Sequence, residues 1–231
     1  MVLDIEENVI QSELQKFHNF TQTNKLVINK KKCFVMKFSR SKKYDFPTEL
    51  TIGDSDLLEV KKEHTILGII VQDDLKWQSQ CDEMVRRATA TTWALRRMRA
   101  LGVPQATLVQ YWKAEGRVRL EYGCPVWHSS LTIAQSHSLD RAQRAAMAAI
   151  TGRWEPSHTR QLEDLGLERL SARRTKMCRA FAQRTATNSR HKDMFTPVAS
   201  ARRIGTYREI LARTDTYYKS ALPYLTRLLN Q

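Results

Sequence analysis

Carboxylates that could hold catalytic metal ions occur as two close pairs in this sequence. Asp54 and Asp56 are two residues apart, and Asp73 and Asp74 are adjacent. Enzymes that transfer phosphoryl groups between two metal ions hold those ions with such carboxylates. The first pair, however, lies in a turn-like Gly-Asp-Ser-Asp stretch, and the second pair follows directly on an apolar run. We therefore interpret the pairs as a turn and a loop boundary, and we predict no metal site.

Cations interleaved with an aromatic residue form a second chemical pattern. At about 100° per residue, Arg86, Trp93 and Arg97 share one face of a predicted helix. Guanidinium groups hold phosphates, and an indole ring stacks on a base or a sugar. Arg117 and Arg119 flank the end of the next predicted helix and could contact a duplex. The alternative interpretation is that Trp93 packs under a neighbouring helix and the arginines are solvated.

The positive charge is concentrated in the second part of the chain. The net charge is +14, and residues 1–80 contribute none of it because their 12 basic residues match 12 acidic ones. Residues 81–231 carry 26 basic and 12 acidic residues, and 22 of the basic ones are Arg, whose fork binds phosphate in a bidentate way. This distribution predicts a polyanionic partner, and nucleic acid is the usual one. A basic protein without such a partner is the alternative.

Other features of the composition exclude several classes. No apolar run approaches the ~18 residues of a membrane span, and the acidic N-terminus is unlike a secretory signal. We therefore expect a protein of the nucleus or cytoplasm that is not secreted and has no membrane partner. The cysteines are too far apart for a zinc site and are expected to be reduced and partly buried. They are Cys33, Cys81, Cys124 and Cys178.

The patterning predicts an α+β fold. Residues 5–20 are expected to form a helix, followed by short β-rich runs and an exposed basic loop at 39–48. The expected strands are 26–28, 33–38, 49–52, 57–60 and 64–71. From residue 77 the period becomes helical. The expected helices are 77–101, 105–120, 131–151, 158–165 and 168–188, with a bend at 121–130 and a basic tail at 190–231.

Three segments together resemble LINE-like (non-LTR) retrotransposon reverse transcriptases. Asn24–Cys33 is similar to the N-x-L-x-I-N-x-x-K-[TC] stretch that follows their catalytic aspartates. Leu67–Trp77 resembles their "LG-hydrophobic, D-x-L-x-W" signature. Leu120–Trp127, followed by Gln143 and Gly152, resembles the "LEY-x-x-P-V-W … Q … I-x-G" pattern of their thumb. The order and spacing make the joint match strong over about residues 1–155, and Ser220–Asn230 is similar to the C-terminal end of such proteins.

The resemblance implies a division into three parts. Residues 1–76 would be a palm remnant of one helix and a small antiparallel sheet, 77–155 a helical thumb, and 156–231 a basic helical extension. Met1-Val2-Leu3 looks like the strand that leaves the aspartate turn, so both catalytic motifs are expected upstream, and Asp4 is not assigned to catalysis.

Function follows from the same resemblance. Lys32 would approach the nucleotide phosphates and assist the leaving group in the intact enzyme, or else belong to a solvated turn. Gly68 would lie in the primer grip, or else in a buried strand. The predicted partner is an RNA/DNA primer–template, and Mg²⁺ is implied for the intact enzyme, with no cofactor in this chain. We expect the chain to bind without polymerising alone; a non-catalytic protein-interaction module or a decayed element product is the alternative.

Overall fold

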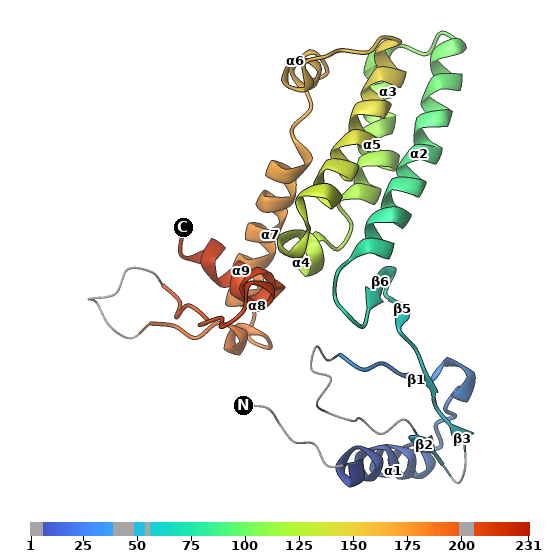
Figure 1. Ribbon diagram of the computed structural model, residues 1–231, viewed down its shortest axis with the longest axis vertical. Coiled ribbons are helices and arrows are strands. Elements are labelled where there is room, and N and C mark those ends of the chain that lie inside the picture. Colours follow the sequence, from blue (N-terminus) through green and yellow to red (C-terminus); the bar gives the residue numbers. More distant parts are fainter. Residues whose placement is uncertain (1–6, 39–48, 54–55, 199–205) are drawn as a thin grey trace. The chain divides into compact units, whose positions relative to one another are not determined.

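The computed structural model describes residues 7–38, 49–53, 56–198 and 206–231. The chain divides into two compact units, Met1–Leu75 and Lys76–Gln231 (Figure 1). The expected basic loop at 39–48, together with Asp4 and Asp54, lies outside the described residues.

A single helix covers a small core in the first unit. Helix α1 spans Glu7–Thr23 and places Ile10 and Leu14 against buried apolar residues from the short strands. Those buried residues are Leu50, Ile52 and Leu58. The Gln11 side chain fixes the helix to the strand beside it, because its amide nitrogen donates to the Thr51 carbonyl at 3.0 Å and its oxygen accepts from the Thr51 N–H at 3.0 Å.

The strands of this unit are shorter and less continuous than the sequence predicts. Strands β1 (Phe34–Val35) and β4 (Glu59–Val60) pair in parallel, whereas β2 (Thr51–Ile52) and β3 (Asp56–Leu57) pair antiparallel. The expected single antiparallel sheet is therefore wrong: the described strands form separate two-stranded pairs, one of which is parallel. The expected strand at 26–28 is also wrong, since these residues are irregular and Val27 is 96 % exposed.

The expected strand at 64–71 is a hairpin. Strands β5 (Glu63–Ile66) and β6 (Ile69–Gln72) pair antiparallel around a two-residue turn of Leu67 and Gly68. Both turn residues have positive φ, 49° and 80°, as a type I′ turn requires. Gly68 thus lies at the tip of a hairpin and not in a buried strand. Glycine adopts this positive φ without the steric cost of a side chain.

Two long helices form the core of the second unit. Helices α2 (Gln78–Ala100) and α5 (Ile133–Thr151) pack along each other (Figure 1). The helical period expected from residue 77 is confirmed in α2: its apolar stripe is buried from Cys81 to Leu95, and Met98 at the end of the stripe is partly exposed. Helix α5 starts with a capping box, in which the Thr132 hydroxyl accepts from the Gln135 N–H at 3.2 Å and the Gln135 side chain accepts from the Thr132 N–H at 2.8 Å.

The expected helix at 105–120 changes its hydrogen-bond pattern twice. Helix α3 (Gln105–Tyr111) continues as a π-helical segment, η2 (Trp112–Arg117), and then as a 3₁₀ turn, η3 (Val118–Leu120). Trp112 is fully buried, and a β-carbon at Gly116 would overlap its ring. The glycine therefore makes room for the indole within this helical run.

The bend expected at residues 121–130 is a packed corner. The corner comprises α4 (Cys124–Trp127) and η4 (His128–Ser130). Trp127 is fully buried, and its indole N–H donates to the Tyr122 carbonyl at 3.0 Å. The buried ring and its satisfied N–H make this corner rigid.

The remaining residues complete the second unit instead of forming a separate compact body. Helices α6 (His158–Asp164) and α7 (Leu170–Thr187) follow the C-cap at Gly152, where φ is 76°. The tail contains η5 (Lys192–Met194), α8 (Asp215–Lys219) and α9 (Ala221–Leu229). Across the described residues, no helix has both the length and the apolar character that a bilayer span needs.

Candidate nucleic-acid interface

The exposed face of α2 contains three of the predicted binding residues. Trp93 is 61 % exposed, so the alternative in which it packs under a neighbouring helix is wrong. The Arg96 guanidinium lies over its ring, 5.0 Å from the centroid. Arg97 is exposed and has no ion pair with any carboxylate in the described ranges. An exposed indole beside two guanidinium groups can stack on a base or sugar while the cations hold phosphates.

Arg86, which lies earlier on α2, differs from its partners on this face. Its Nε and Nη2 donate to the two oxygens of Glu83 at 2.6 and 2.8 Å, and Arg87 Nε donates to the same carboxylate at 2.6 Å. The hydrogen bonds from Arg86 and then Arg87 lower the pKa of Glu83 to about 2. Because this carboxylate is ionised and holds both guanidiniums, Arg86 presents less free positive charge to a phosphate than Arg97 does.

The two predicted arginines after helix α3 are also paired with acids. Arg119 Nε donates to the Glu115 carbonyl at 2.8 Å and Nη2 to the Glu115 carboxylate at 3.2 Å. Arg117 has a side chain only 15 % exposed, with Nε 3.8 Å from a Glu121 carboxylate oxygen. Burial, followed by the charge of Arg173, lowers the pKa of Arg117. A duplex contact by Arg117 would therefore require a side chain that is now mostly covered.

Lys32 and Gly68 belong to the first compact unit. Lys32 is exposed in the 3₁₀ turn η1 (Lys30–Lys32), and Lys30 of the same turn forms an ion pair with Asp56. Gly68 lies in the hairpin turn, beside a Leu67 that is 86 % exposed. Both residues are thus accessible on short loops of this unit, and their roles toward nucleic acid stay predictions.

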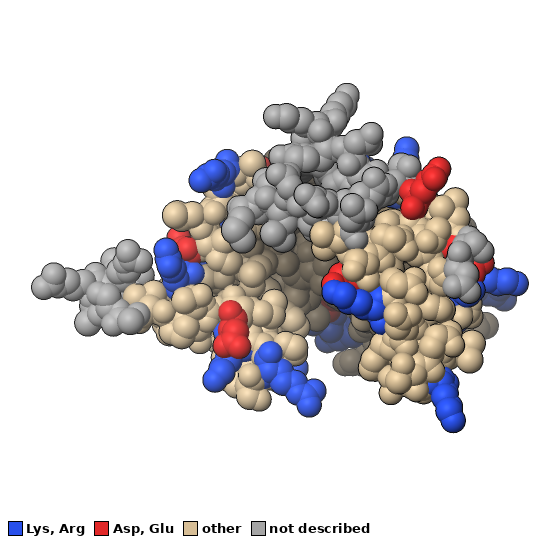
Figure 2. Space-filling view, turned by 90° about the horizontal axis from the view of Figure 1, so that it is seen from below, with Lys and Arg blue, Asp and Glu red and all other residues tan. Residues whose placement is uncertain are grey.

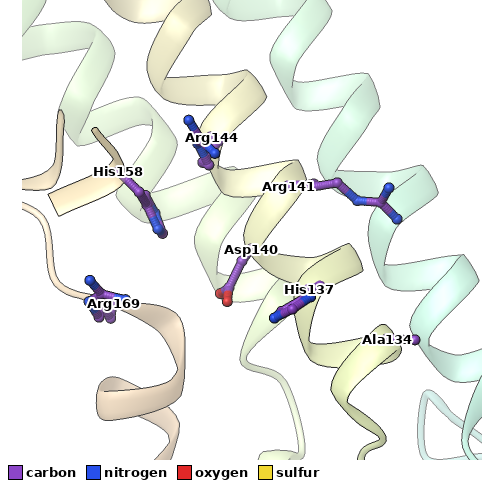
Figure 3. Close-up of a pocket in the computed structure, with 7 residues that line it drawn as sticks. All are labelled: Ala134, His137, Asp140, Arg141, Arg144, His158 and Arg169. Atoms are coloured by element: carbon purple, nitrogen blue, oxygen red, sulfur yellow. The ribbon is translucent and has the colours of Figure 1, made fainter. Parts of the chain in front are cut away.

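A cavity of about 570 Å³ in the second unit gathers charged residues that the sequence did not single out. Helix α5 contributes most of the lining residues, and α6 contributes its first residue (Figure 3). The last lining residue directly precedes α7. They are Ala134, His137, Asp140, Arg141, Arg144, His158 and Arg169. Figure 3 shows the Arg141 guanidinium turned away from His158 and Arg169, so its charge lies apart from the others.

The polar atoms around this cavity are incompletely satisfied by the protein. Arg144 Nη2 donates to the Glu155 and Pro156 carbonyls, each at 3.1 Å, but its Nε is buried and has no hydrogen-bond partner within the described chain. The buried Nε2 of His158 likewise lacks a partner there. Burial lowers the pKa of His158, although the charge of Asp140 opposes this effect. A buried polar atom without a partner is costly, and a ligand could satisfy it.

A buried arginine lies behind this part of the unit. Arg174 of α7 is fully buried; its Nε donates to His128 Nδ1 at 3.3 Å, and its guanidinium lies 5.7 Å from the Trp127 ring centroid. Burial lowers the pKa of Arg174, and the Asp140 carboxylate is the first of the charges that oppose this. Asp140 therefore stabilises the buried guanidinium as well as facing the cavity.

The charged side chains elsewhere on the surface do not form one large patch in the view of Figure 2. On this face, the Lys and Arg side chains stand singly or beside acidic ones. The cavity and the face of α2 each bring cations and an aromatic residue together, as do Arg227 and Tyr218 near the C-terminus.

Residues His137, Arg144, His158 and Arg169 were missed because their convergence is tertiary. In the sequence, His137 and His158 are far apart and resemble ordinary surface or core histidines. A signal was present in Arg153-Trp154-Glu155-Pro156-Ser157-His158, where cations and an aromatic residue follow a helix end. The positions of these residues in the sequence did not reveal that Arg169 lines the same cavity as His158.

Comparisons with known proteins provide no relative for this chain: no family model, curated protein or solved structure matches it. The described residues gather no group of three or more His, Cys, Asp or Glu that could hold a metal ion. The Mg²⁺ implied for an intact polymerase is held by carboxylate oxygens that converge on one point, and the described ranges bring no such group together.

Proposed function

We propose that this chain is a nucleic-acid-binding segment of a LINE-like reverse transcriptase, which holds an RNA/DNA primer–template and does not polymerise alone. The observation that carries the proposal is the charge excess of residues 81–231, where 22 arginines are concentrated in the helical part. The sequence resemblance supports the choice of partner. It also supports the absence of polymerisation, because the aspartate motifs are expected upstream of this segment.

The α2 face supplies the contacts in this proposal. Arg97 and Arg96 hold backbone phosphates, and the exposed ring of Trp93 lies against a sugar or a terminal base. Arg86 contributes less, because Glu83 already holds its guanidinium. Phosphate contacts carry no sequence information, so binding has little sequence preference.

The test measures binding of a labelled RNA–DNA hybrid to the full chain by fluorescence anisotropy across a series of KCl concentrations. The logarithm of the affinity falls with the logarithm of the salt concentration by about 0.9 per phosphate contact. Arg97→Gln therefore reduces the slope by about 1 and weakens binding. The matched control is Arg184→Gln, which removes one exposed charge from α7.

Two results would contradict this proposal. The first is a chain that stays unbound at low salt, where phosphate contacts are strongest. The second is an equal effect of Arg97→Gln and Arg184→Gln on the affinity and on its salt dependence. Binding would then depend on the net charge of the chain and not on the α2 face.

A protein-interaction function is the second candidate, favoured by exposed apolar residues on α1. Phe17 and Phe20 of this helix are 52 % and 57 % exposed, and Val9 is 50 % exposed. Exposed aromatic residues that gather on one helix are typical of protein interfaces. A chain that captures one specific protein and ignores the hybrid duplex would favour this function over nucleic-acid binding.

A further inference from the structure

We propose that the cavity lined by α5, α6 and the residue before α7 binds a phosphate group of single-stranded nucleic acid, with the adjacent base stacked on Trp154. This inference deepens the proposed function and rests on it for the class of macromolecule. It differs in the site, which shares no lining residue with the α2 face, and in the strandedness of the ligand.

The charge of the cavity favours an anion. Arg144 and Arg169 both line it, and neither forms an ion pair with a carboxylate in the described part of the chain. Asp140 is the single acid among the described residues that line it, and its charge also stabilises the buried Arg174 guanidinium. The charges of Arg144 and Arg169 are therefore not neutralised by a carboxylate partner, and planar guanidiniums bind phosphate oxygens in a bidentate way.

One hydrogen-bond donor at the cavity is held in place by a single contact, and another has no partner in the described chain. Arg169 Nη2 donates to the Thr159 hydroxyl at 2.7 Å, which fixes one end of its fork and leaves the other nitrogens free for a ligand. The His158 Nε2 has no partner among the residues described but is itself buried, so the exposed Arg169 is the donor that a ligand in the cavity reaches directly. Figure 3 shows His158 and Arg169 on the side of the cavity that faces Asp140 and His137.

Trp154 adds a stacking surface beside these cations. The Arg144 guanidinium lies over the Trp154 ring, 4.4 Å from its centroid, while the residue remains 60 % exposed. The carbonyls of Glu155 and Pro156 accept from Arg144, so the guanidinium and the loop that carries the indole are tied together. An exposed indole next to a phosphate site offers its open face to a base.

The shape of the site favours a single strand over a duplex. A cavity of about 570 Å³ has room for a phosphate and part of its sugar, whereas a duplex would meet the surface only with its outer phosphates. A base can stack on Trp154 only if it is free of its own paired neighbours, as bases of single strands are. The cavity and the indole together thus match one nucleotide of an unpaired segment.

The experiment uses the full chain and two probes, inorganic phosphate followed by ³¹P NMR titration and a labelled oligo(dA) of about 12 nucleotides followed by anisotropy. Arg169→Gln should weaken both probes about tenfold, the usual effect of losing a charge-assisted contact. Arg169→Lys keeps the charge without the fork and should give an intermediate loss. The matched control is Arg160→Gln, which removes an exposed charge from α6 that does not line the cavity and should leave both affinities near wild type.

Trp154→Ala separates the two parts of the site. It should weaken oligo(dA) by between about fivefold and about a hundredfold, because one stacked base is lost. It should weaken inorganic phosphate much less than oligo(dA), because phosphate has no base to stack. Trp154→Phe, which keeps an aromatic face, should restore most of the oligo(dA) affinity.

Several results would overturn the inference. They are equal losses in Arg169→Gln and Arg160→Gln, unchanged oligo(dA) binding in Trp154→Ala, and a wild-type chain that binds neither probe. Failure of the proposed function is distinct from these results. A chain that ignores the hybrid duplex yet binds phosphate through Arg169 keeps the cavity site and loses the primer–template role. A chain that binds the duplex with equal effects of the two Gln variants keeps that role and loses the cavity site.

Discussion

Protonation of His128 should destabilise the second unit in mildly acidic solution. Its Nδ1 accepts a hydrogen bond from the buried Arg174 at 3.3 Å, and its Nε2 lies 3.3 Å from the Thr175 hydroxyl. A protonated ring would lose its acceptor and place a second positive charge against a guanidinium. Burial, followed by the charge of Arg174, accordingly lowers the pKa of His128 from 6.5 to about 4.

The direction and size of the effect follow from this pKa. Between about pH 6.5 and 4 the unfolded chain binds a proton at His128 that the folded chain does not bind, so the free energy of unfolding falls as the pH falls. At about 1.4 kcal/mol per pKa unit, the full loss is about 3 kcal/mol, and it is complete below about pH 4. Well above about pH 6.5 this group contributes no pH dependence.

The measurement compares urea unfolding of the wild type and His128→Asn between about pH 7.5 and about pH 4, followed by circular dichroism. The asparagine oxygen can accept from Arg174 in place of Nδ1 but does not titrate, and all other groups are common to both proteins. The wild type should lose about 3 kcal/mol more than the variant over this range. Parallel losses in the two proteins would refute the reasoning, since His128 would then titrate alike in the folded and unfolded chains.

Three further predictions concern buried charge, packing and backbone strain. Glu121→Gln removes a buried carboxylate held by two guanidiniums and should lower the free energy of unfolding in urea by about 3 kcal/mol. The control Glu115→Gln breaks an exposed pair and should cost less than about 1 kcal/mol, so equal costs would contradict the burial of Glu121. Gly116→Ala places a methyl group against a buried indole and should lower the free energy of unfolding by about 3 kcal/mol. The control Gly102→Ala meets no atom within 4 Å and should lose only about 1 kcal/mol through the strain of its φ of 79°, so the reverse order would refute the overlap at Gly116. Leu67→Asn should raise the melting temperature of the first unit, because Asn tolerates the φ of 49° better than Leu does. A lowered melting temperature would show that the Leu side chain stabilises the unit by more than the backbone strain costs.

The long helices of the second unit were predictable from the sequence. The apolar positions of α2 recur at steps of three and four along the helix, and that period identifies a buried stripe without any tertiary knowledge. Helix α5 had the same advantage and a glycine at its end, where the chain takes φ 76°. Trp93 was placed correctly on the exposed face because the period that buries Cys81 and Leu95 also fixes the opposite side.

The strands of the first unit were harder to predict. A run such as 64–71 is largely apolar, and its composition does not distinguish one strand from two short ones joined by a turn. The hairpin depends on a leucine that adopts positive φ, a choice that local propensity disfavours. The parallel pairing of Phe34–Val35 with Glu59–Val60 is a contact between distant segments, and no local pattern encodes it.

The sequence by itself determined the helical period, the charge asymmetry and the exposed cations and indole of α2, because each is a property of neighbouring residues or of composition. Only the tertiary structure decided which cations are free. Glu83 holds Arg86, and Glu121 lies under Arg117, while Arg144, His158 and Arg169 converge on one cavity from three elements. The physical reason is that the strength of a charge depends on its distance from opposite charges and on its burial, and both are set by the packing of segments that are far apart in the chain.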